Sequence, residues 1–242
     1  MNKTWDIVVP ADFECTSNEY RINGKNYARV TQTLSSISKP GLVAWFLKVG
    51  HARANKIKET RQNLGTRVHK LFEDILKGKK VDTSTCNTEI KDDVWLFNIF
   101  KDECKLQPEA LEQHLWSNNY GYAGTADYIG YYTPDAKYIV RGHSRFKGKS
   151  YVLLDWKTST SIHDEYWLQL AAYLQAFEEL TGIRLDGAAV VQFRNGQVKI
   201  KERTYDELQA LFKVYISNLI IYHWQHNNMD EVNAVFNKLK KL

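Results

Sequence analysis

Cysteine is scarce in this chain of 242 residues. Its three cysteines, Cys15, Cys86 and Cys104, are far apart and odd in number, which argues against a disulfide framework and against a CxxC zinc site. No uninterrupted apolar run approaches the roughly 18 residues of a membrane-spanning helix, and the first residues lack the apolar segment of a secretory signal. We therefore expect an intracellular protein whose thiols are buried or incidental.

Internal repeats, low-complexity segments and obvious linkers are also missing. With 43% hydrophobic and 25% charged residues, the composition is that of an ordinary globular protein. The length suits one α/β domain with a sizeable core. We expect a single domain over residues 1–242, with a mainly helical part at 1–110, a sheet with one long helix at 111–202, and C-terminal helices at 203–242.

Positive charge is concentrated in two segments. Residues 39–80 contain eleven Lys or Arg and only three acidic residues, although the net charge of the whole chain is only +5. A second basic run, RGHSRFKGKS, adds four more basic residues, Arg141, Arg145, Lys147 and Lys149. Both segments could be solvated surfaces, but two basic surfaces that flank a carboxylate site suit a phosphate polymer better than a small anion.

The predicted elements are helical first and mixed afterwards. The Asn-Gly turn at residues 23–24 marks a short hairpin, Pro40 opens a helix, and apolar residues at helical spacing over 64–76 mark another. A further amphipathic helix is expected at 92–105. Strands are expected between 111 and 140 and at 151–157, followed by a helix from about 164 to 180, a hairpin around residues 195–196 and a last helix from 205. This order predicts an α/β domain with a helical N-terminal part and a mixed sheet.

The stretch SYVLLDWKTST, residues 150–160, ends an apolar strand in opposite charges. Period-two alternation places Asp155 and Lys157 on one face with Leu153, and Trp156 on the other face. A salt bridge between neighbours explains most pairs of this kind. However, Asp127 in GYAGTADYIG lies among apolar residues, where an unpaired carboxylate would be costly to bury.

Two such carboxylates indicate a divalent cation, because Mg²⁺ and Mn²⁺ prefer hard oxygen ligands and keep room for water and a phosphate. Lys157 would then lie beside the ion. There it could orient or help deprotonate a water and offset the charge that develops on a phosphate under attack.

Polar residues also interrupt two helical stripes. Gln169 and Tyr173 are four residues apart on one face of the helix expected at 164–180, with Tyr166 three residues before Gln169. Tyr173 could equally be a core residue, whereas Gln169 lies between two leucines and needs a polar partner. His69 is at the edge of an apolar stripe, where a lone histidine is more often structural than a ligand.

Taken in order, these motifs resemble the PD-(D/E)XK nucleases, specifically their RecB-like branch. GTRVH resembles the histidine motif of that branch, LEQHLWSNNYGYAGTADYIG its Glu and Asp strands, LLDWKTS its D-x-K core, and QLAAY its Q-x-x-x-Y helix. The segment RINGKNYARVTQTLSSISKPGLVAWFLKVGHARANKI is similar to the N-terminal part of phage-encoded members and of the mitochondrial genome maintenance exonuclease. Each motif is weak evidence alone. Five motifs in the order and spacing of the family, over roughly residues 20–177, make a chance match improbable.

The resemblance implies a restriction-endonuclease-like core, a central mixed β-sheet flanked by helices, with a helical N-terminal part. It implies Mg²⁺ or Mn²⁺ bound by His69, Asp127 and Asp155, with the Trp156 carbonyl also facing the ion. CRISPR-associated members of the branch add an iron–sulfur cluster, built from one early cysteine and a group after the Q-x-x-x-Y helix. No cysteine follows Cys104 here, so we expect no cluster.

The same resemblance implies the catalytic roles. Lys157 would be the catalytic lysine, and Glu112 would help to bind a second metal ion or its waters. Gln169 and Tyr173 would position Lys157 and the scissile phosphate.

For strand capture, we expect aromatic and basic residues of the N-terminal helices to arch over a single strand. Phe46 could stack on bases, whereas Trp45 is the better candidate for a core position. The predicted DNA-binding residues are Lys48, Arg53, Lys56, Lys58, Arg67, Arg141, Arg145, Lys147 and Lys149. For the run 141–149, a DNA-contacting flap and a disordered loop are equal alternatives.

These inferences predict a metal-dependent exonuclease that hydrolyses DNA from its ends, prefers single strands or single-stranded ends, and acts in replication, recombination or repair. If the chain is viral, its location would be the cytoplasm of a bacterial or archaeal host. Two alternatives use the same residues: a structure-specific or nicking endonuclease, and a catalytically silent nucleic-acid binding module. The intact Asp127, Asp155 and Lys157 speak against the silent module.

Overall fold

The computed structural model describes residues 5–16, 19–140 and 142–240. Within these residues the central element is an eight-stranded mixed sheet with the strand order β1-β2-β3-β5-β6-β7-β8, in which β4 pairs with β5. The strands are β1 (Glu14–Cys15), β2 (Glu19–Ile22), β3 (Lys25–Arg29), β4 (Gln107–Ser117), β5 (Tyr122–Tyr132), β6 (Ser150–Lys157), β7 (Gly187–Arg194) and β8 (Gln197–Thr204).

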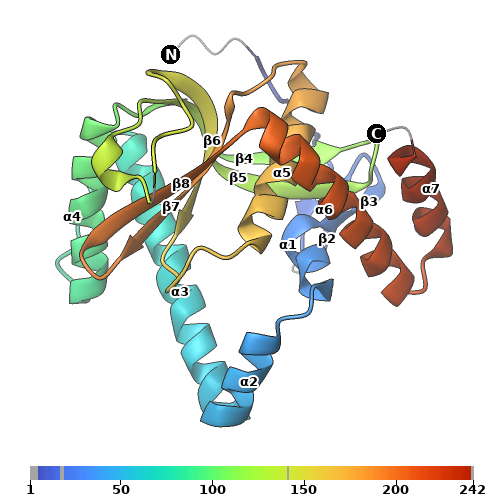
Figure 1. Ribbon diagram of the computed structural model, residues 1–242, viewed down its shortest axis with the longest axis horizontal. Coiled ribbons are helices and arrows are strands. Elements are labelled where there is room, and N and C mark those ends of the chain that lie inside the picture. Colours follow the sequence, from blue (N-terminus) through green and yellow to red (C-terminus); the bar gives the residue numbers. More distant parts are fainter. Residues whose placement is uncertain (1–4, 17–18, 141, 241–242) are drawn as a thin grey trace.

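Helices pack on both faces of the sheet (Figure 1). They are α1 (Val30–Thr33), α2 (Pro40–Val49), α3 (His51–Leu76), α4 (Thr88–Glu103), α5 (Glu165–Thr181), α6 (Tyr205–Gln225) and α7 (Met229–Leu239), with short 3₁₀ turns η1 (Leu34–Ser36) and η2 (Ala136–Tyr138). The predicted architecture, a central mixed sheet flanked by helices, is confirmed.

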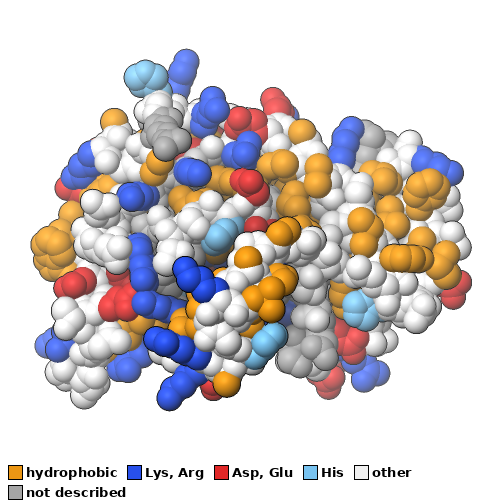
Figure 2. Space-filling model, turned by 60° about the horizontal axis from the view of Figure 1, so that its bottom comes forward, with side chains coloured by type: hydrophobic (Ala, Val, Ile, Leu, Met, Phe, Trp, Pro, Cys, Tyr) orange, Lys and Arg blue, Asp and Glu red, His pale blue; other side chains and the backbone are white. Residues whose placement is uncertain are grey.

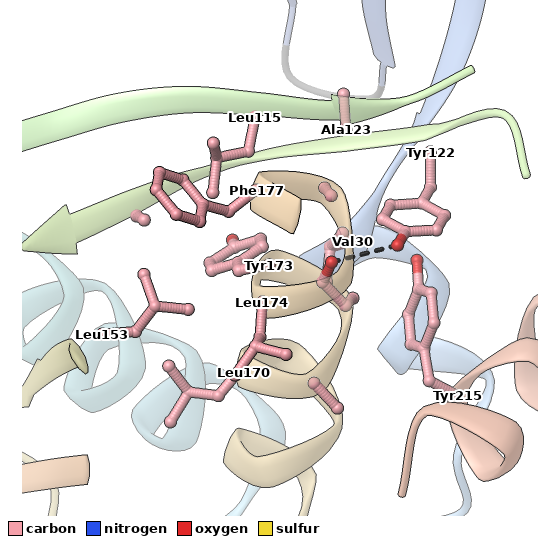
Figure 3. Packing of buried hydrophobic residues seen from close by; sticks show 14 of the residues in the cluster. Val30, Leu115, Tyr122, Ala123, Leu153, Leu170, Tyr173, Leu174, Phe177 and Tyr215 are labelled. Carbon is pink, nitrogen blue, oxygen red and sulfur yellow. Dashed lines mark hydrogen bonds between the residues drawn. The ribbon is translucent and has the colours of Figure 1, made fainter. Parts of the chain in front are cut away.

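Two hydrophobic cores lie on opposite faces of the sheet. On one face α3 and α4 bury a cluster in which the rings of Phe72 and Phe97 stack with centroids 3.8 Å apart and Trp156 packs edge-on to them. On the other face α5 and α6 cover a cluster that includes Leu153 and Tyr173 (Figure 3). Because Leu153 and Trp156 belong to different cores, the predicted alternation along β6 is confirmed.

The N-terminal part contains more strand than expected. The Asn-Gly turn joins β2 to β3 as predicted, but β3 also pairs in parallel with the start of β5 and so belongs to the main sheet. The expected strand up to residue 140 was too long, since β5 ends at Tyr132. Pro134 lacks the N–H that a strand donates, and the carboxylate of Asp135 caps the backbone N–H of Lys137 to start η2.

Helix α2 and the adjoining half of α3 project from the body of the molecule (Figure 1). No residue of α2 is buried, and Leu42, Val43 and Leu47 are exposed. The expectation that Trp45 occupies a core position is therefore wrong: its side chain is only partly buried, on a helix that packs mainly against the start of α3.

The remaining expectations about thiols and membranes concern the described residues only. There Cys15 is exposed while Cys86 and Cys104 are buried, and all three are free thiols. No helix in the described ranges combines the length and the hydropathy that crossing a membrane requires.

Candidate active site

The candidate site lies beside β5, at the point where β3 stops pairing with one edge of this strand and β6 begins to pair with the same edge. Strand β4 pairs along the whole opposite edge, while β3 pairs at Tyr122 and Ala123 and β6 pairs at residues 128–132. Among the described residues, 124–127 therefore have no ladder partner on the shared edge. The Asp127 carboxylate turns to this opening, where Oδ2 accepts a hydrogen bond from the backbone N–H of Trp156 at 2.9 Å. The fork thus brings the end of β6 to an acidic side chain of β5.

Asp155 and Lys157 form a buried ion pair at the C-terminal end of β6. The Lys157 Nζ lies 2.7 Å from Oδ2 and 2.9 Å from Oδ1 of Asp155. The Lys157 side chain is 17% exposed and the Asp155 side chain is 4% exposed. Although Oδ2 is close to the ammonium, it has no partner with hydrogen-bond geometry, so this buried oxygen keeps an unused acceptor position.

A second cluster combines one residue from each of three elements. Helix α3 supplies His69, β4 supplies Glu112 and β5 supplies Asp127, and one ligand atom from each lies within 4.8 Å of the others. The Nδ1 of His69 is 3.4 Å from Oδ2 of Asp127. Glu112 has a φ of 49° inside a strand, a backbone conformation that costs a non-glycine residue about 1–3 kcal/mol and that is concentrated at functional sites.

His69 and Asp127 stabilise each other as a charged pair. Burial disfavours the imidazolium of His69, but the neighbouring Asp127 carboxylate outweighs burial and raises the pKa of the histidine. Burial likewise opposes ionisation of Asp127, but His69 and Lys157 together hold its pKa below the usual range. Asp127 is therefore a carboxylate at neutral pH.

The other two carboxyl groups are harder to ionise. Burial raises the pKa of Asp155 to about 6 even though Lys157 opposes the shift, and burial together with the charge of Asp127 raises the pKa of Glu112 to about 7. For Lys157, the carboxylates of Asp155 and Asp127 outweigh burial and raise the pKa of the ammonium. Crowded carboxyl groups of this kind favour an additional cation.

The donor set fits a divalent metal ion. One imidazole nitrogen and two carboxylates converge within 4.8 Å, and the unused Oδ2 of Asp155 adds a buried oxygen nearby. Hard oxygen donors with one imidazole suit Mg²⁺ or Mn²⁺. The converging group differs from the ligand set expected from the sequence, because Glu112 takes part in it while Asp155 pairs with Lys157.

Helix α5 supports the ion pair from one side. The Gln169 Nε2 lies 3.3 Å from Asp155 Oδ1 and 3.3 Å from the Tyr173 hydroxyl, and the Lys157 Nζ lies 4.7 Å from the centroid of the Tyr166 ring. Tyr173 is also a core residue, packed near Leu153 (Figure 3). The two interpretations of Tyr173 from the sequence are thus compatible.

No family model matches this sequence, and no curated protein matches it either. Among solved structures, the chain is similar to an alkaline exonuclease (LHK-Exo) from Laribacter hongkongensis, with 12% identity, a TM-score of 0.40, and coverage of 89% of this chain and 94% of that chain. It is also similar to SSO0001, with 14% identity, a TM-score of 0.31, and coverage of 78% and 81%. Similarity at this level does not establish a shared activity.

The predicted DNA-binding residues fall into two groups. Those on α2 and α3 are all exposed: Lys48, Arg53, Lys56, Lys58 and Arg67. In the described part of the chain, none of these five forms a salt bridge, whereas basic residues near the end of α3 pair with Glu73 and Asp74. Apart from Arg61, which pairs with Glu89, the basic side chains of α2 and the adjoining half of α3 are therefore available to a ligand.

The second basic run is ordered where the structure describes it. Arg141 lies outside the described residues. The backbone N–H of Arg145 donates to Glu202, and Phe146 is buried, so this part of the run packs against the body of the molecule. Lys149 donates to Gln107 and precedes the start of β6, about 26 Å along the strand from Lys157 at about 3.3 Å per residue. Lys147 is exposed at the same end.

Three features of the site could not be recognised as such in the sequence. The first is the convergence of Glu112 with His69 and Asp127, which depends on a left-handed backbone position in β4. The second is the contact of Tyr166 with Lys157. The third is Gly124, where an added Cβ would lie 2.3 Å from the ring of Tyr173. The sequence signals for these were the resemblance, which gave Glu112 a role at a second metal ion or its waters, the spacing of Tyr166 and the presence of Gly124 three residues before Asp127.

Proposed function

We propose that this chain is a metal-dependent deoxyribonuclease with a restriction-endonuclease-like core, which hydrolyses phosphodiester bonds from DNA ends in replication, recombination or repair. The observation that carries the proposal is the convergence of His69, Glu112 and Asp127 within 4.8 Å, beside the buried pair of Asp155 and Lys157. The metal-ligating residue types suit a metal ion that activates water, and a buried lysine can stabilise charge on a phosphate, so together they suit hydrolysis of a phosphodiester.

His69, Glu112 and Asp127 would hold the ion, with Asp155 Oδ2 and the Trp156 carbonyl as further oxygen ligands. A bound Mg²⁺ or Mn²⁺ would acidify water and offset negative charge on the phosphate. The hydrogen bond from the Trp156 N–H to Asp127 fixes that carboxylate at the fork. It leaves the second oxygen of Asp127 free to act as a ligand, so the strands themselves orient the donor set.

Lys157 would act on the phosphate. Asp155 and the Tyr166 ring hold its ammonium in place, and the group stays protonated, since the two aspartates raise its pKa. An ammonium fixed in a site with little water can donate to a phosphate oxygen as charge develops on it. Gln169, bound to both Asp155 and Tyr173, would keep the ion pair in this orientation.

The projection formed by α2 and the adjoining half of α3 would capture a single strand. It combines exposed apolar residues, Leu42, Val43, Leu47 and Ile57, with the unpaired basic residues named above. Figure 2 shows Lys and Arg side chains beside hydrophobic ones on the face that contains the bottom of the molecule. Apolar and aromatic surfaces stack on bases while basic groups neutralise phosphates, a combination typical of single-strand binding.

The direct test is the degradation of end-labelled linear single-stranded DNA beside a closed circle of the same sequence. We expect Mg²⁺-dependent loss of the linear strand alone, with no loss in EDTA. Cleavage of the circle would replace the exonuclease with an endonuclease on the same site. Binding without cleavage of either substrate, in Mg²⁺ and in Mn²⁺, would contradict the nuclease proposal.

A further inference from the structure

A polar cavity lies away from the metal-ligand cluster, at the outer edge of the sheet. Its volume is about 190 Å³, which is smaller than the roughly 300–1,000 Å³ of pockets for whole small molecules. It is formed by β8, which is the edge strand (Figure 1), by the start of α5 and by the loop after η2. Its lining residues are Ile139, Val140, His143, Arg145, Asp164, Trp167, Lys201, Glu202 and Arg203. We call it the Arg203 pocket.

Arg203 has unused hydrogen-bonding capacity in this pocket. Its guanidinium lies over the ring of Trp167, 5.0 Å from the centroid, and its Nε is buried without a hydrogen-bond partner. Within the described residues no salt bridge is formed by Arg203 or Lys201. A stacked guanidinium with a free edge is pre-organised to bind an oxyanion.

The two acidic residues of the lining do not use up this positive charge. Glu202 accepts hydrogen bonds from the Tyr132 hydroxyl on one oxygen and from Ser144 and the Arg145 N–H on the other, so both oxygens are occupied. Three cationic side chains, those of Arg145, Lys201 and Arg203, therefore face Asp164 and a fully bonded Glu202. Arg145 also lies 3.5 Å from Glu207, which leaves Arg203 and Lys201 as the main anion donors.

Two residues of the pocket, Lys201 and Arg203, lie on the same face of the sheet as the ion pair of the candidate site, whereas Glu202 between them points to the other face. Lys201 pairs with Val190, which pairs with Asp155, and paired residues on adjacent strands point to the same face. Two strand spacings separate Lys201 from Asp155, about 10 Å, a distance that neighbouring nucleotides of one strand can span. The first turn of α5 connects the sites, because Tyr166 contacts Lys157 while Trp167 contacts Arg203.

We propose that the Arg203 pocket binds a phosphate group of the same DNA strand, close to the bond that is cut. This inference rests on the proposed nuclease function for the identity of the ligand. The pocket would fix the register of the DNA strand. A phosphate bound by the guanidinium of Arg203, which is held over the Trp167 ring, would determine which phosphodiester reaches Lys157.

The test measures binding without cleavage. A short, labelled single-stranded oligonucleotide is titrated in EDTA, and its affinity is followed by fluorescence anisotropy over a range of salt concentrations. The variants are Arg203→Gln and Lys201→Gln, with Lys199→Gln as the matched control, because Lys199 is on the same face of β8 and exposed but does not line the pocket. Titration with inorganic phosphate is a second arm.

We expect Arg203→Gln to weaken DNA binding by about fivefold or more and to lower the slope of log K against log salt by about 0.7, the loss of one phosphate contact on a single strand. Lys201→Gln should weaken binding by about threefold, and Lys199→Gln by less than about twofold. If Arg203→Gln does not fold, which thermal unfolding will reveal, the exposed Lys201 carries the test.

Equal losses in Lys199→Gln and the pocket variants would overturn the proposal, since the effect would then be general charge. Unchanged DNA binding would also overturn it, even where inorganic phosphate binds the wild type and not Arg203→Gln, because the pocket would then hold a free anion. Cleavage is not measured here. A wild type that cuts no DNA would therefore remove the nuclease proposal and leave the binding result as it stands.

Discussion

At the scale of single residues, Glu112 was expected to help at a second metal ion or its waters, and the geometry places it in one cluster with His69 and Asp127. Burial and the charge of Asp127 raise its pKa to about 7, and its backbone occupies the left-handed region inside a strand. The raised pKa shows that the Glu112 carboxyl group lies close to another acidic group, and the strained backbone shows that the strand holds the residue in this position. A bound cation would remove this electrostatic cost.

We predict that Glu112→Gln lowers metal affinity and slightly stabilises the metal-free protein. Thermal unfolding with and without Mn²⁺ measures both effects: the wild type should gain about 2.7 kcal/mol at a Mn²⁺ concentration of about 100 times Kd, and the variant should gain much less. Glu59→Gln, at an exposed position of α3, is the control and should behave as the wild type. An undiminished gain in Glu112→Gln would remove Glu112 from the ligand set.

Asp93 of α4 gives a pH dependence that is independent of the candidate site. Burial, together with Glu89, raises its pKa to about 7, above about 3.9 for an unfolded chain. Between these values the folded protein holds a proton that the unfolded chain has released, so the stability contributed by this group falls as the pH rises.

Asp93→Asn removes this titration. We expect the variant to unfold at nearly the same temperature as the wild type near pH 4, and to be more stable than the wild type at pH 8 by up to about 4 kcal/mol, at about 1.36 kcal/mol for each pH unit between the two pKa values. Asp92→Asn, at the exposed neighbouring position, is the control and should show no such difference. A constant difference between Asp93→Asn and wild type from pH 4.5 to 8 would contradict the assigned pKa.

At the scale of elements, the contact between α5 and β5 depends on Gly124. A Cβ at this position would lie 2.3 Å from Cε1 and 2.8 Å from the hydroxyl oxygen of Tyr173. Neither the rigid ring nor the strand can move without disturbing the bond between Tyr173 and Gln169. The close approach therefore links the packing of a helix on a strand to the orientation of the ion pair.

We predict that Gly124→Ala destabilises the protein by about 1–3 kcal/mol, as expected for overpacking, and also lowers the cleavage rate. Urea unfolding and a rate measured at saturating DNA are the two readouts. The control is Gly41→Ala on α2, where a Cβ meets no atom within 4 Å and alanine favours the helix by about 1 kcal/mol. Wild-type stability in Gly124→Ala would show that Tyr173 can move.

Features that lie within one strand or helix could be predicted from the sequence, whereas the pairing between distant strands could not. Alternation along β6 depends only on one strand, so the shared face of Asp155 and Lys157 was predictable. The helix of Gln169 was predictable from its apolar period for the same reason. The fork at β5 was not, because it requires β3 and β6 to meet on one edge, and the pairing of Ala28 with Tyr122, 122 − 28 = 94 residues later, leaves no local pattern.

Trp45 illustrates the opposite error. Apolar residues on α2 indicate burial if the helix packs on the body, yet α2 projects from it and buries none of them. Hydrophobicity alone does not distinguish a helix that packs in the core from a helix whose apolar face is exposed for binding.

At the scale of the whole molecule, the described basic residues of α2 and the adjoining half of α3 are unpaired except for Arg61, whereas those near the end of α3 form salt bridges. This distribution predicts which lysines and arginines contribute to DNA binding. The double variant Arg53→Gln/Lys56→Gln should weaken single-strand binding and lower the salt slope by about 1.4, at about 0.7 for each phosphate contact.

The matched control is Lys77→Gln/Lys79→Gln, which removes the same charge from residues paired with Glu73 and Asp74. Its affinity should change by less than about twofold, and its slope should match that of the wild type. If both double variants lose affinity equally, DNA binding depends on net charge and the projection has no special part in it.

The measurement that tests the central claim most directly is the single-turnover cleavage rate of Lys157→Ala with Mg²⁺ at saturating linear single-stranded DNA, with the DNA affinity measured in EDTA on the same protein. We predict a rate lower by about 10²–10³-fold and a Kd within about threefold of wild type, once circular dichroism has shown that the variant folds despite the unpaired Asp155. Cleavage at the wild-type rate, or a loss of rate that DNA affinity fully explains, would contradict the assignment of this site as the catalytic centre.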